Sequence, residues 1–225
     1  LGGDLVNSTG EPTKKLQIPA IPQQTGRRTS TPHTLRLLVP GEVDARISAE
    51  IKSTDGTFSP VGINGRVVAH QKVVEIPLDV TMASGKFALH IKSDQPILGS
   101  VFSRTLSQGK RDFVWSTSAE DLTDFTLATT GLAPTLVFTG DRIKVNLELT
   151  YTNGKTKKVT VASEDIATFV VSASVRSVSF SRISAGTSGA ALITSKSGYG
   201  YIPLNPGSVL TTSSVPASNI RVLNP

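Results

Sequence analysis

Three histidines, His33, His70 and His90, are the side chains of this sequence best suited to acid–base chemistry near neutral pH. A serine hydrolase needs a serine, a basic histidine and a carboxylate that converge in space. His90 falls on the polar phase of an alternating segment, where we expect solvent around it, and His33 follows a proline in a linker-like stretch. No G-x-S-x-G motif occurs. We therefore expect no catalytic residues and a protein that is not an enzyme.

Metal and cofactor sites are not expected either. The chain has no cysteine, which excludes thiolate ligands and disulfides, and its histidines lack the spacing of a zinc site. Carboxylates gather at residues 120–124 and 164–165, where they suit either a calcium-binding loop or ordinary turns. Glu50 and Glu148 occupy polar strand faces, where solvation explains them without a glycosidase mechanism. No glycine-rich phosphate-binding loop is present.

Aromatic side chains at alternating positions are the remaining candidates for binding. Trp115 and Phe113 follow a basic pair at residues 110–111, and Tyr199 alternates with Tyr201 near the end of the chain. Aromatic rings can stack on sugars, and a tyrosine pair can form a ledge for them. The alternatives are a place in the core for Trp115 and a plain sheet edge for the tyrosines. We take Trp115, Tyr199 and Tyr201 as the candidate ligand-binding residues.

The composition indicates that short strands joined by turns position these side chains. Serine, threonine, valine and isoleucine are abundant, and 19 glycines and 13 prolines supply turn residues. Polar and apolar residues alternate along several segments, such as the one in which Ile47, Ala49 and Ile51 share a face opposite Ser48 and Glu50. Because successive side chains of a strand point to opposite faces, these segments predict antiparallel sheets that are buried on one face and wet on the other.

An internal repeat organises the predicted strands. Residues 38–56 match residues 136–154, with an alternating strand followed by an Asp-Gly or Asn-Gly turn in both copies. Such dipeptides are strong signals for a β-hairpin. Further along, residues 84–93 match residues 188–197. The repeating unit of roughly 95 residues is too long for a propeller blade and is the size of a small sandwich.

We therefore predict an all-β fold of two tandem antiparallel β-sandwich domains, immunoglobulin-like in the broad sense, at residues 14–107 and 110–203. Residues 1–13 are expected to be a flexible N-terminal segment. Residues 204–225 are expected to be an extension rich in proline, serine and threonine. No apolar stretch approaches the roughly 18 residues that a membrane span needs.

The charge balance bears on the class of partner. The formal net charge is +6 and the isoelectric point is about 9.7, which favours acidic partners. The basic residues form only pairs, however, and they are not interleaved with a series of aromatic residues. We therefore expect an anionic wall polymer, a glycan or another envelope protein as the partner, and we do not expect nucleic acid.

Several segments follow one another in an order that is typical of one protein family. They are residues 34–41, 55–62, 73–78 and 85–104, with Trp115 in the connector and a proline-rich end. In this order the sequence resembles a family of secreted actinobacterial proteins of unknown function, of the "large secreted protein" type, over about residues 32–225. The resemblance implies tandem β-sandwich repeats outside the membrane. That family has no agreed activity, so no functional residue can be transferred.

Together these features predict a non-catalytic structural or adhesive module of a bacterial cell envelope. We expect it to be extracellular or at the cell surface. Because the first residues lack the features of a signal peptide, we expect the sequence to be a mature fragment. The alternative is a module that binds carbohydrate or a cell-wall polymer. A further alternative is a viral coat protein, which a basic all-β chain would also suit.

Overall fold

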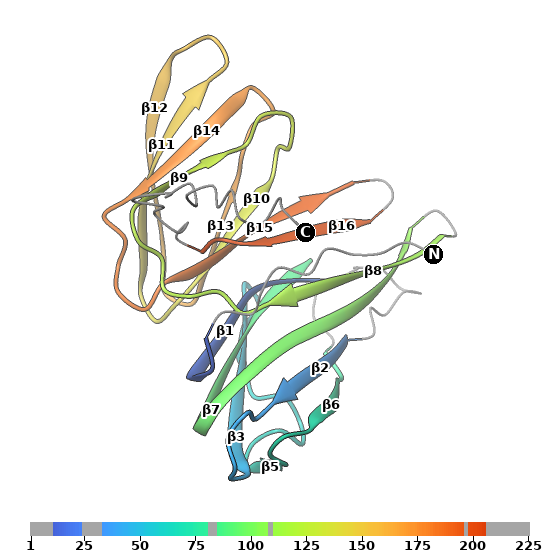
Figure 1. Ribbon diagram of the computed structural model, residues 1–225. Coiled ribbons are helices and arrows are strands. Elements are labelled where there is room, and N and C mark those ends of the chain that lie inside the picture. The colour runs from blue at the N-terminus through green and yellow to red at the C-terminus, as the bar shows by residue number, and fades with distance from the viewer. Residues whose placement is uncertain (1–10, 24–32, 81–84, 108–109, 196–197, 206–225) are drawn as a thin grey trace, which may run out of the picture.

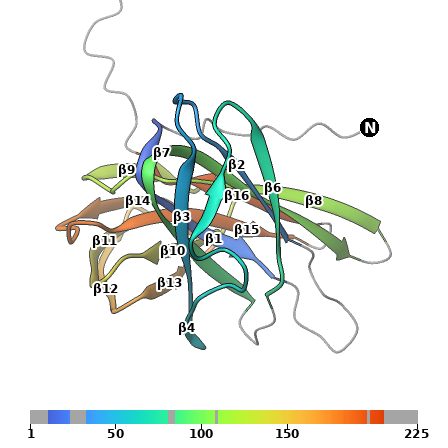
Figure 2. The same ribbon diagram turned by 90° about the horizontal axis from the view of Figure 1, so that it is seen from below.

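The computed structural model describes residues 11–23, 33–80, 85–107, 110–195 and 198–205, and this part of the protein is all-β. Its sheets are antiparallel, and the described residues include no helix, so none that could cross a membrane. The prediction of an all-β fold with antiparallel sheets is thus confirmed. Figure 1 shows two groups of strands, which we call the first half (β1–β8) and the second half (β9–β16). Seen from below, the first half lies in front of the second (Figure 2).

The first half is built around one long strand. Its strands are β1 (Thr13–Pro22), β2 (His33–Leu38), β3 (Ala45–Ser53), β4 (Gly56–Phe58), β5 (Arg66–Val68), β6 (Val73–Leu78), β7 (Lys86–Ser107) and β8 (Lys110–Thr117). The first part of β7 pairs with β1 and β3, and its second part pairs with β2 and β8. Strand β7 therefore passes from one sheet layer into the other. Side chains such as Leu16, Leu35, Phe87 and Val101 fill the core between the layers.

The second half has two four-stranded sheets. Its strands are β9 (Phe125–Ala128), β10 (Thr135–Thr139), β11 (Ile143–Tyr151), β12 (Thr156–Ser163), β13 (Ile166–Val170), β14 (Val175–Ser181), β15 (Ser188–Thr194) and β16 (Tyr199–Pro203). One sheet has the order β13-β10-β15-β16 and the other β12-β11-β14-β9. Phe138 from the first sheet packs edge-on against Phe180 from the second, with ring centroids 6.2 Å apart. The sheets enclose a separate core in a sandwich-like arrangement.

The sequence repeat coincides with one hairpin in each half. Strand β3 continues through a turn into β4, and β11, at the matching position, continues into β12. Gly56 and Gly154, the glycines of the two predicted turns, both have positive φ, a conformation that glycine adopts without strain. Strand β8, although it falls within the predicted repeat 110–203, pairs with β7 of the first half. Residues 1–10 and 206–225, most of the predicted terminal segments, lie outside the described residues.

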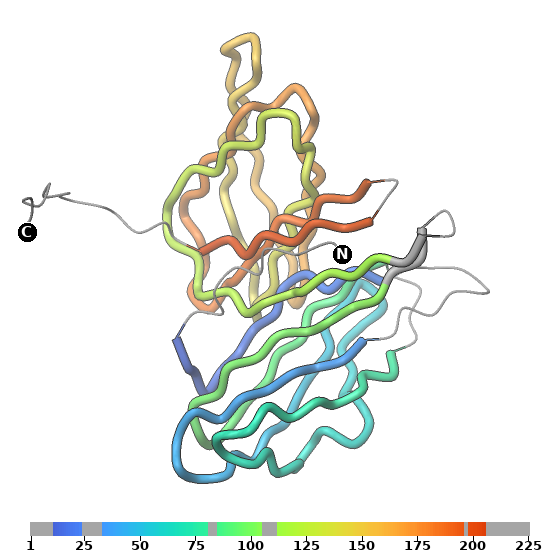
Figure 3. The backbone as a smooth tube through the Cα atoms, turned by 45° about the vertical axis from the view of Figure 1, so that its right-hand side comes forward, coloured from blue at the N-terminus to red at the C-terminus, as the bar shows by residue number. Residues whose placement is uncertain are grey.

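The two halves are joined by close packing of small side chains. Strand β1 runs along the junction (Figure 3) and contacts β10 and β15 of the second half. Ala20 and Ala88 from the first half form a core cluster with Val137, Ile166 and Ala190 from the second. Alanine leaves room for two sheets to approach each other closely. The expectation of a wet outer face is therefore wrong for the first part of β7, because the second half covers that face.

Candidate functional site

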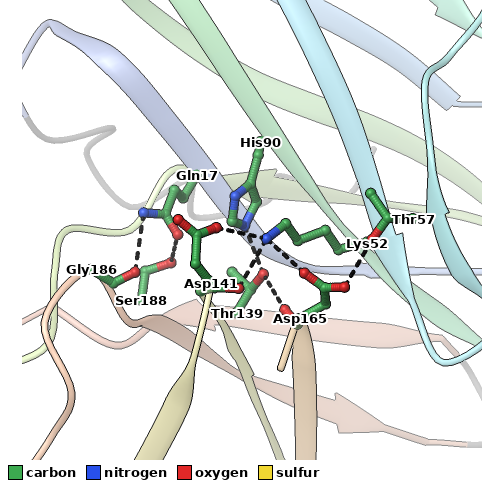
Figure 4. Close-up of polar contacts among 10 residues, drawn as sticks. Gln17, Lys52, Thr57, His90, Thr139, Asp141, Asp165, Gly186 and Ser188 are labelled. Carbon is green, nitrogen blue, oxygen red and sulfur yellow. Dashed lines mark hydrogen bonds and ion pairs between the residues drawn. The ribbon is translucent and has the colours of Figure 1, made fainter. Parts of the chain in front are cut away.

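A buried lysine connects the two halves at the end of this junction (Figure 4). The Nζ of Lys52 donates to the carbonyl oxygen of Gly140 at 2.9 Å, and it lies 3.0 Å from Oδ1 of Asp141 and 2.9 Å from Oδ1 of Asp165. Asp165 also accepts a hydrogen bond from Thr57 at 3.1 Å. The lysine side chain is only 4 % exposed. Three acceptors match the three N–H donors of an ammonium group, which is what a buried charge requires.

The ion pairs keep this network charged. Burial alone would lower the pKa of Lys52, but its hydrogen bonds to Asp165 and Asp141 outweigh that effect and raise the pKa. The hydrogen bond from Lys52 in turn lowers the pKa of both carboxyl groups. At neutral pH the network therefore carries one positive and two negative charges across the junction. Its arrangement is that of a structural clamp.

His90 extends the network from strand β7. Its Nε2 lies 2.6 Å from Oγ1 of Thr139, and the Thr139 hydroxyl donates to the backbone oxygen of Asp165 at 3.0 Å. A hydroxyl has one hydrogen to donate, so Nε2 of His90 must be the donor to Thr139. Burial, with a smaller effect from the charge of Lys52, lowers the pKa of His90 to about 4. The expectation of solvent around His90 is wrong, since the second half covers this face of β7.

Gln17 on strand β1 makes a second polar contact across the junction. Its Oε1 accepts a hydrogen bond from Oγ of Ser188 at 3.0 Å, and its Nε2 donates to the carbonyl oxygen of Gly186 at 3.5 Å (Figure 4). The backbone oxygen of Gln17 also accepts from the amide of Ala119 at 2.9 Å. Apolar packing, the lysine clamp and these hydrogen bonds together fix the orientation of one half against the other.

A groove of about 770 Å³ opens beside this network. Carboxylates and ammonium groups share its walls, including Glu50, Lys92 and Asp121, and His90 forms part of the lining. The neutral imidazole of His90 is paired with the hydroxyl of Thr139, which is fully buried and cannot meet a substrate. The groove thus lacks, among the described residues, an exposed nucleophile hydrogen-bonded to this histidine.

The other two histidines lie apart from the groove. His33 begins strand β2, where its Nδ1 lies 2.8 Å from Oγ of Ser103 and its ring packs edge-on against Phe87. The interpretation of this stretch as a linker is wrong at His33, because β2 pairs with both β6 and β7 there. Burial lowers the pKa of His33 to about 4. Exposed His70 lies 2.6 Å from Oδ1 of Asp44. The structure brings no two histidines together.

The acidic residues singled out in the sequence lie in different parts of the structure. Glu120 and Asp121 line the groove, whereas Asp165 belongs to the lysine clamp. Glu148 is paired with Lys158 at 3.5 Å on the outer face of the second half. Among the described residues, no three His, Cys, Asp or Glu side chains converge as they would around a metal ion.

Trp115 lies on an open sheet face in the first half. It is half-buried, and its ring centroid is 4.9 Å from that of Phe102, which in turn is 5.6 Å from Phe113. The guanidinium of Arg36 lies 4.7 Å from the centre of the Trp115 ring, and that of Arg104 lies 5.8 Å from the centre of the Phe102 ring. Both arginines are exposed. We call these five residues the aromatic–arginine face.

Cross-strand pairing builds this face. Phe102 on β7 is directly opposite Trp115 on β8, and Arg104 is opposite Phe113. Residues directly opposite each other in an antiparallel pair project to the same side of the sheet. Arg36 reaches the ring of Trp115 from strand β2, on the other side of β7. Phe102 and the two arginines were missed in the sequence, although the register of β7 against β8 would have placed Phe102 beside Trp115.

A shallow hollow of about 370 Å³ adjoins Trp115 on the same face. It is mainly apolar, with Leu38, Val73 and Leu98 in its lining, and Arg36 and Ser100 add polar groups. The Nε of Arg36 also lies 2.6 Å from a carboxylate oxygen of Glu75. The hollow therefore offers aliphatic surface, contact with Trp115, and donors and acceptors on a neighbouring ion pair.

The two candidate tyrosines are placed differently. The hydroxyl of Tyr201 donates to the backbone oxygen of Thr117 at 2.5 Å, and its ring packs against the core cluster of the junction. Tyr199 is half-buried on the same strand, β16. Burial raises the pKa of both phenols. Tyr201 thus ties β16 to the end of β8, and its hydroxyl is used within the protein.

Comparison with known proteins gives one match. Residues 1–194 match DUF5719, described as a family of unknown function. This match includes the first 31 residues, which lie outside the resemblance noted in the sequence. No curated protein and no solved structure is detectably similar to the chain.

Proposed function

This chain belongs to DUF5719, a family of unknown function, and we propose a function from its structure. The protein is a non-catalytic adhesive module that acts outside the cell, and it binds its partner through the aromatic–arginine face. The observation that carries the proposal is the grouping of one tryptophan, two phenylalanines and two arginines on an open sheet. Tryptophan and arginine are among the residues that contribute most to binding energy at interfaces.

The junction supports the proposal by making the face part of a rigid body. A face on paired strands has little freedom to lose on binding, so little binding energy is spent on ordering it. Lys52 and Tyr201 hold the second half against the two sheet layers of the first. The second half would then act as a rigid neighbour of the binding face. This role needs no catalytic group.

The extracellular and bacterial-envelope part of the proposal rests on the sequence. A chain without cysteine needs no particular redox environment. The surface strands are rich in serine and threonine, and the segment order resembles that of secreted proteins. Fractionation of the source cells with an antibody against this chain tests the location, and recovery only in the cytosolic fraction would contradict it.

Binding is tested with isolated envelope separated into polysaccharide and protein fractions. We expect saturable binding of the chain to one fraction, and we expect Trp115→Ala to weaken it by about tenfold or more, because interface tryptophans often account for about 2 kcal/mol. Phe58→Ala is the matched control, since Phe58 is also a partly exposed aromatic but lies on the separate strand β4. Equal binding by Trp115→Ala and the wild type would disprove the assignment of the face.

A further inference from the structure

We infer that the ligand of the aromatic–arginine face is an acidic polysaccharide, with one sugar ring in the hollow beside Trp115 and an acidic group on Arg104. This inference rests on the proposed function and names the class of its ligand. Three observations support it: the lining of the hollow, the ion pair beside it, and the position of Arg104.

The hollow matches the two-sided character of a sugar ring. A pyranose has apolar C–H surfaces and a polar edge of hydroxyl groups. Leu38, Val73 and Leu98 offer aliphatic surface, and Trp115 stands at the side. The volume of about 370 Å³ is at the small end of the range for ligand sites, which is roughly 300–1,000 Å³. One ring with its substituents is a suitable occupant.

The ion pair at the hollow supplies both kinds of hydrogen-bonding group. Arg36 lines the hollow and is paired with Glu75. A sugar hydroxyl can donate and accept at once, so it can use the carboxylate of Glu75 and the guanidinium of Arg36 together. Hydrogen bonds to charged groups are roughly twice as strong as neutral ones. A purely aliphatic peptide side chain would leave this pair unused.

Arg104 adds an uncompensated positive charge. It is exposed, lies against the ring of Phe102, and is paired with no carboxylate among the described residues. Its guanidinium lies 5.8 Å from the centre of the Phe102 ring, and that centre lies 4.9 Å from the centre of the Trp115 ring, which lines the hollow. An acidic group on a neighbouring sugar can therefore meet Arg104 while one ring fills the hollow. The net charge of +6 favours the same sign of ligand.

Single-stranded nucleic acid is the competing class, since it combines planar rings with phosphates. The rings of the face are less suited to it. Trp115 and Phe102 are tilted by 53°, and Phe102 and Phe113 by 34°. Arginines lie over the rings of Trp115 and Phe102. Bases need open, flat ring faces on which to stack, whereas the aliphatic hollow accepts a puckered sugar. We therefore favour the polysaccharide and include nucleic acid in the test.

The experiment begins with the intact chain on an array of defined oligosaccharides that carry uronate, phosphate or no charge, together with oligothymidylate. Calorimetry then compares three polymers: polygalacturonate, the same polymer with its carboxylates methyl-esterified, and poly-L-glutamate. Esterification removes the charge and keeps the rings, whereas polyglutamate keeps the charge without the rings. If binding needs both the charge and the sugar rings, the affinity for polygalacturonate should be at least about tenfold higher than that for the esterified polymer or for polyglutamate.

Two substitutions separate the contributions. Trp115→Ala should weaken binding to charged and esterified saccharides alike. Arg104→Gln should weaken binding only to the charged saccharides, and Arg176→Gln, which removes an exposed arginine of the second half, should have no effect. Thermal unfolding of each variant verifies that it folds. If Trp115→Ala does not fold, Trp115→Thr takes its place, since threonine removes the ring and favours a strand.

The outcomes distinguish this inference from the proposed function. Binding to polyglutamate or oligothymidylate as tight as to the acidic saccharides would overturn the inference, and so would an array without any acidic saccharide bound. If the envelope fraction still binds and Trp115→Ala still weakens that binding by about tenfold or more, the proposed function stands while the ligand class is wrong. If Trp115→Ala leaves envelope binding intact, the proposed function itself fails.

Discussion

The Nζ of Lys52 lies 2.9 Å from Oδ1 of Asp165, and this ion pair joins strand β3 of the first half to the turn before strand β13 of the second. The lysine is buried, whereas the carboxylate is partly exposed. The contact therefore stabilises the fold mainly by giving the buried ammonium group of Lys52 a hydrogen-bond acceptor where the two halves meet. Several predictions on stability depend on this geometry, and others depend on the aromatic–arginine face, which lies along the second part of β7.

Replacing Lys52 by methionine should destabilise the protein. Lys52→Met keeps the aliphatic packing and removes the donor to the buried carbonyl oxygen of Gly140. An unsatisfied buried carbonyl costs about 1–3 kcal/mol, so we expect a loss of about 2 kcal/mol in the free energy of unfolding. Urea titration measures it. Lys92→Met at an exposed position is the control and should change stability by less than about 0.5 kcal/mol. Equal stability of both variants would contradict a stabilising role for the contacts of Lys52.

Two histidines with lowered pKa values, His33 and His90, should make the protein less stable in mild acid. His33 and His90 have folded-state pKa values of about 4, compared with an ordinary value of 6.5. As the pH falls from about 6.5 towards 4, the unfolded chain binds protons that the folded chain does not, so stability falls with pH. Each histidine should account for about 1.6 kcal/mol between pH 6.5 and pH 5.

Urea unfolding at pH 7 and pH 5 measures this dependence, and His90→Gln isolates one part of it. Glutamine can still donate to Thr139 but does not titrate. The groups whose charges act on His90 are Lys52, Lys92, Asp141 and Asp165. The hydrogen bonds within the network raise the pKa of Lys52 and lower the pKa of Asp141 and Asp165, so these three groups stay ionised over this range. The variant should lose about half of the pH dependence. An unchanged dependence would mean that His90 is not the group that resists protonation.

Tyr201→Phe should loosen strand β16 from strand β8. It removes one hydrogen bond to the backbone oxygen of Thr117 and keeps the ring in the junction. We expect a loss of about 1 kcal/mol in the free energy of unfolding, the usual net value of such a bond. Tyr199→Phe, on the same strand, should have a smaller effect. Hydrogen exchange should show faster opening of β16 in Tyr201→Phe, and equal exchange in both variants would argue against this tie.

Trp115→Phe should retain most of the binding that Trp115→Ala loses. A phenyl ring on β8 can still pack against Phe102 and the guanidinium of Arg36. We expect affinity for the envelope fraction to stay within about tenfold of the wild type, measured by surface plasmon resonance. If phenylalanine performs no better than alanine, the aromatic ring at position 115 is not part of the binding surface.

The strand pattern was readable in the sequence, because alternation and Asx-Gly turns are local signals. They predicted the hairpin from β3 into β4 and the matching hairpin from β11 into β12. Whether the polar face of a strand is solvated or covered depends on segments that are far away in the sequence. Lys52 and His90 alternate with apolar residues just as solvated residues do, and only the small side chains of Ala20 and Ala88 hint at a covering sheet.

The binding face was readable only in part. Trp115 was singled out for its residue type, but its neighbours come from three strands. Arg36 is far from Trp115 in sequence and meets it because β7 pairs with β2 on one side and with β8 on the other. No local pattern encodes this pairing. For Tyr201 the local pattern pointed to a ligand site, because its alternation with Tyr199 suggested a ledge for sugars. In the structure its hydroxyl donates a hydrogen bond to the backbone of β8.

The most direct test of the binding face uses the fluorescence of Trp115, which is the only tryptophan of the chain. Its emission is recorded with and without the envelope fraction that the chain binds, and acrylamide measures its accessibility. Binding through the aromatic–arginine face should shift the emission to shorter wavelength and protect the indole from acrylamide. Saturable binding that leaves both the emission and the quenching of Trp115 unchanged would contradict the account.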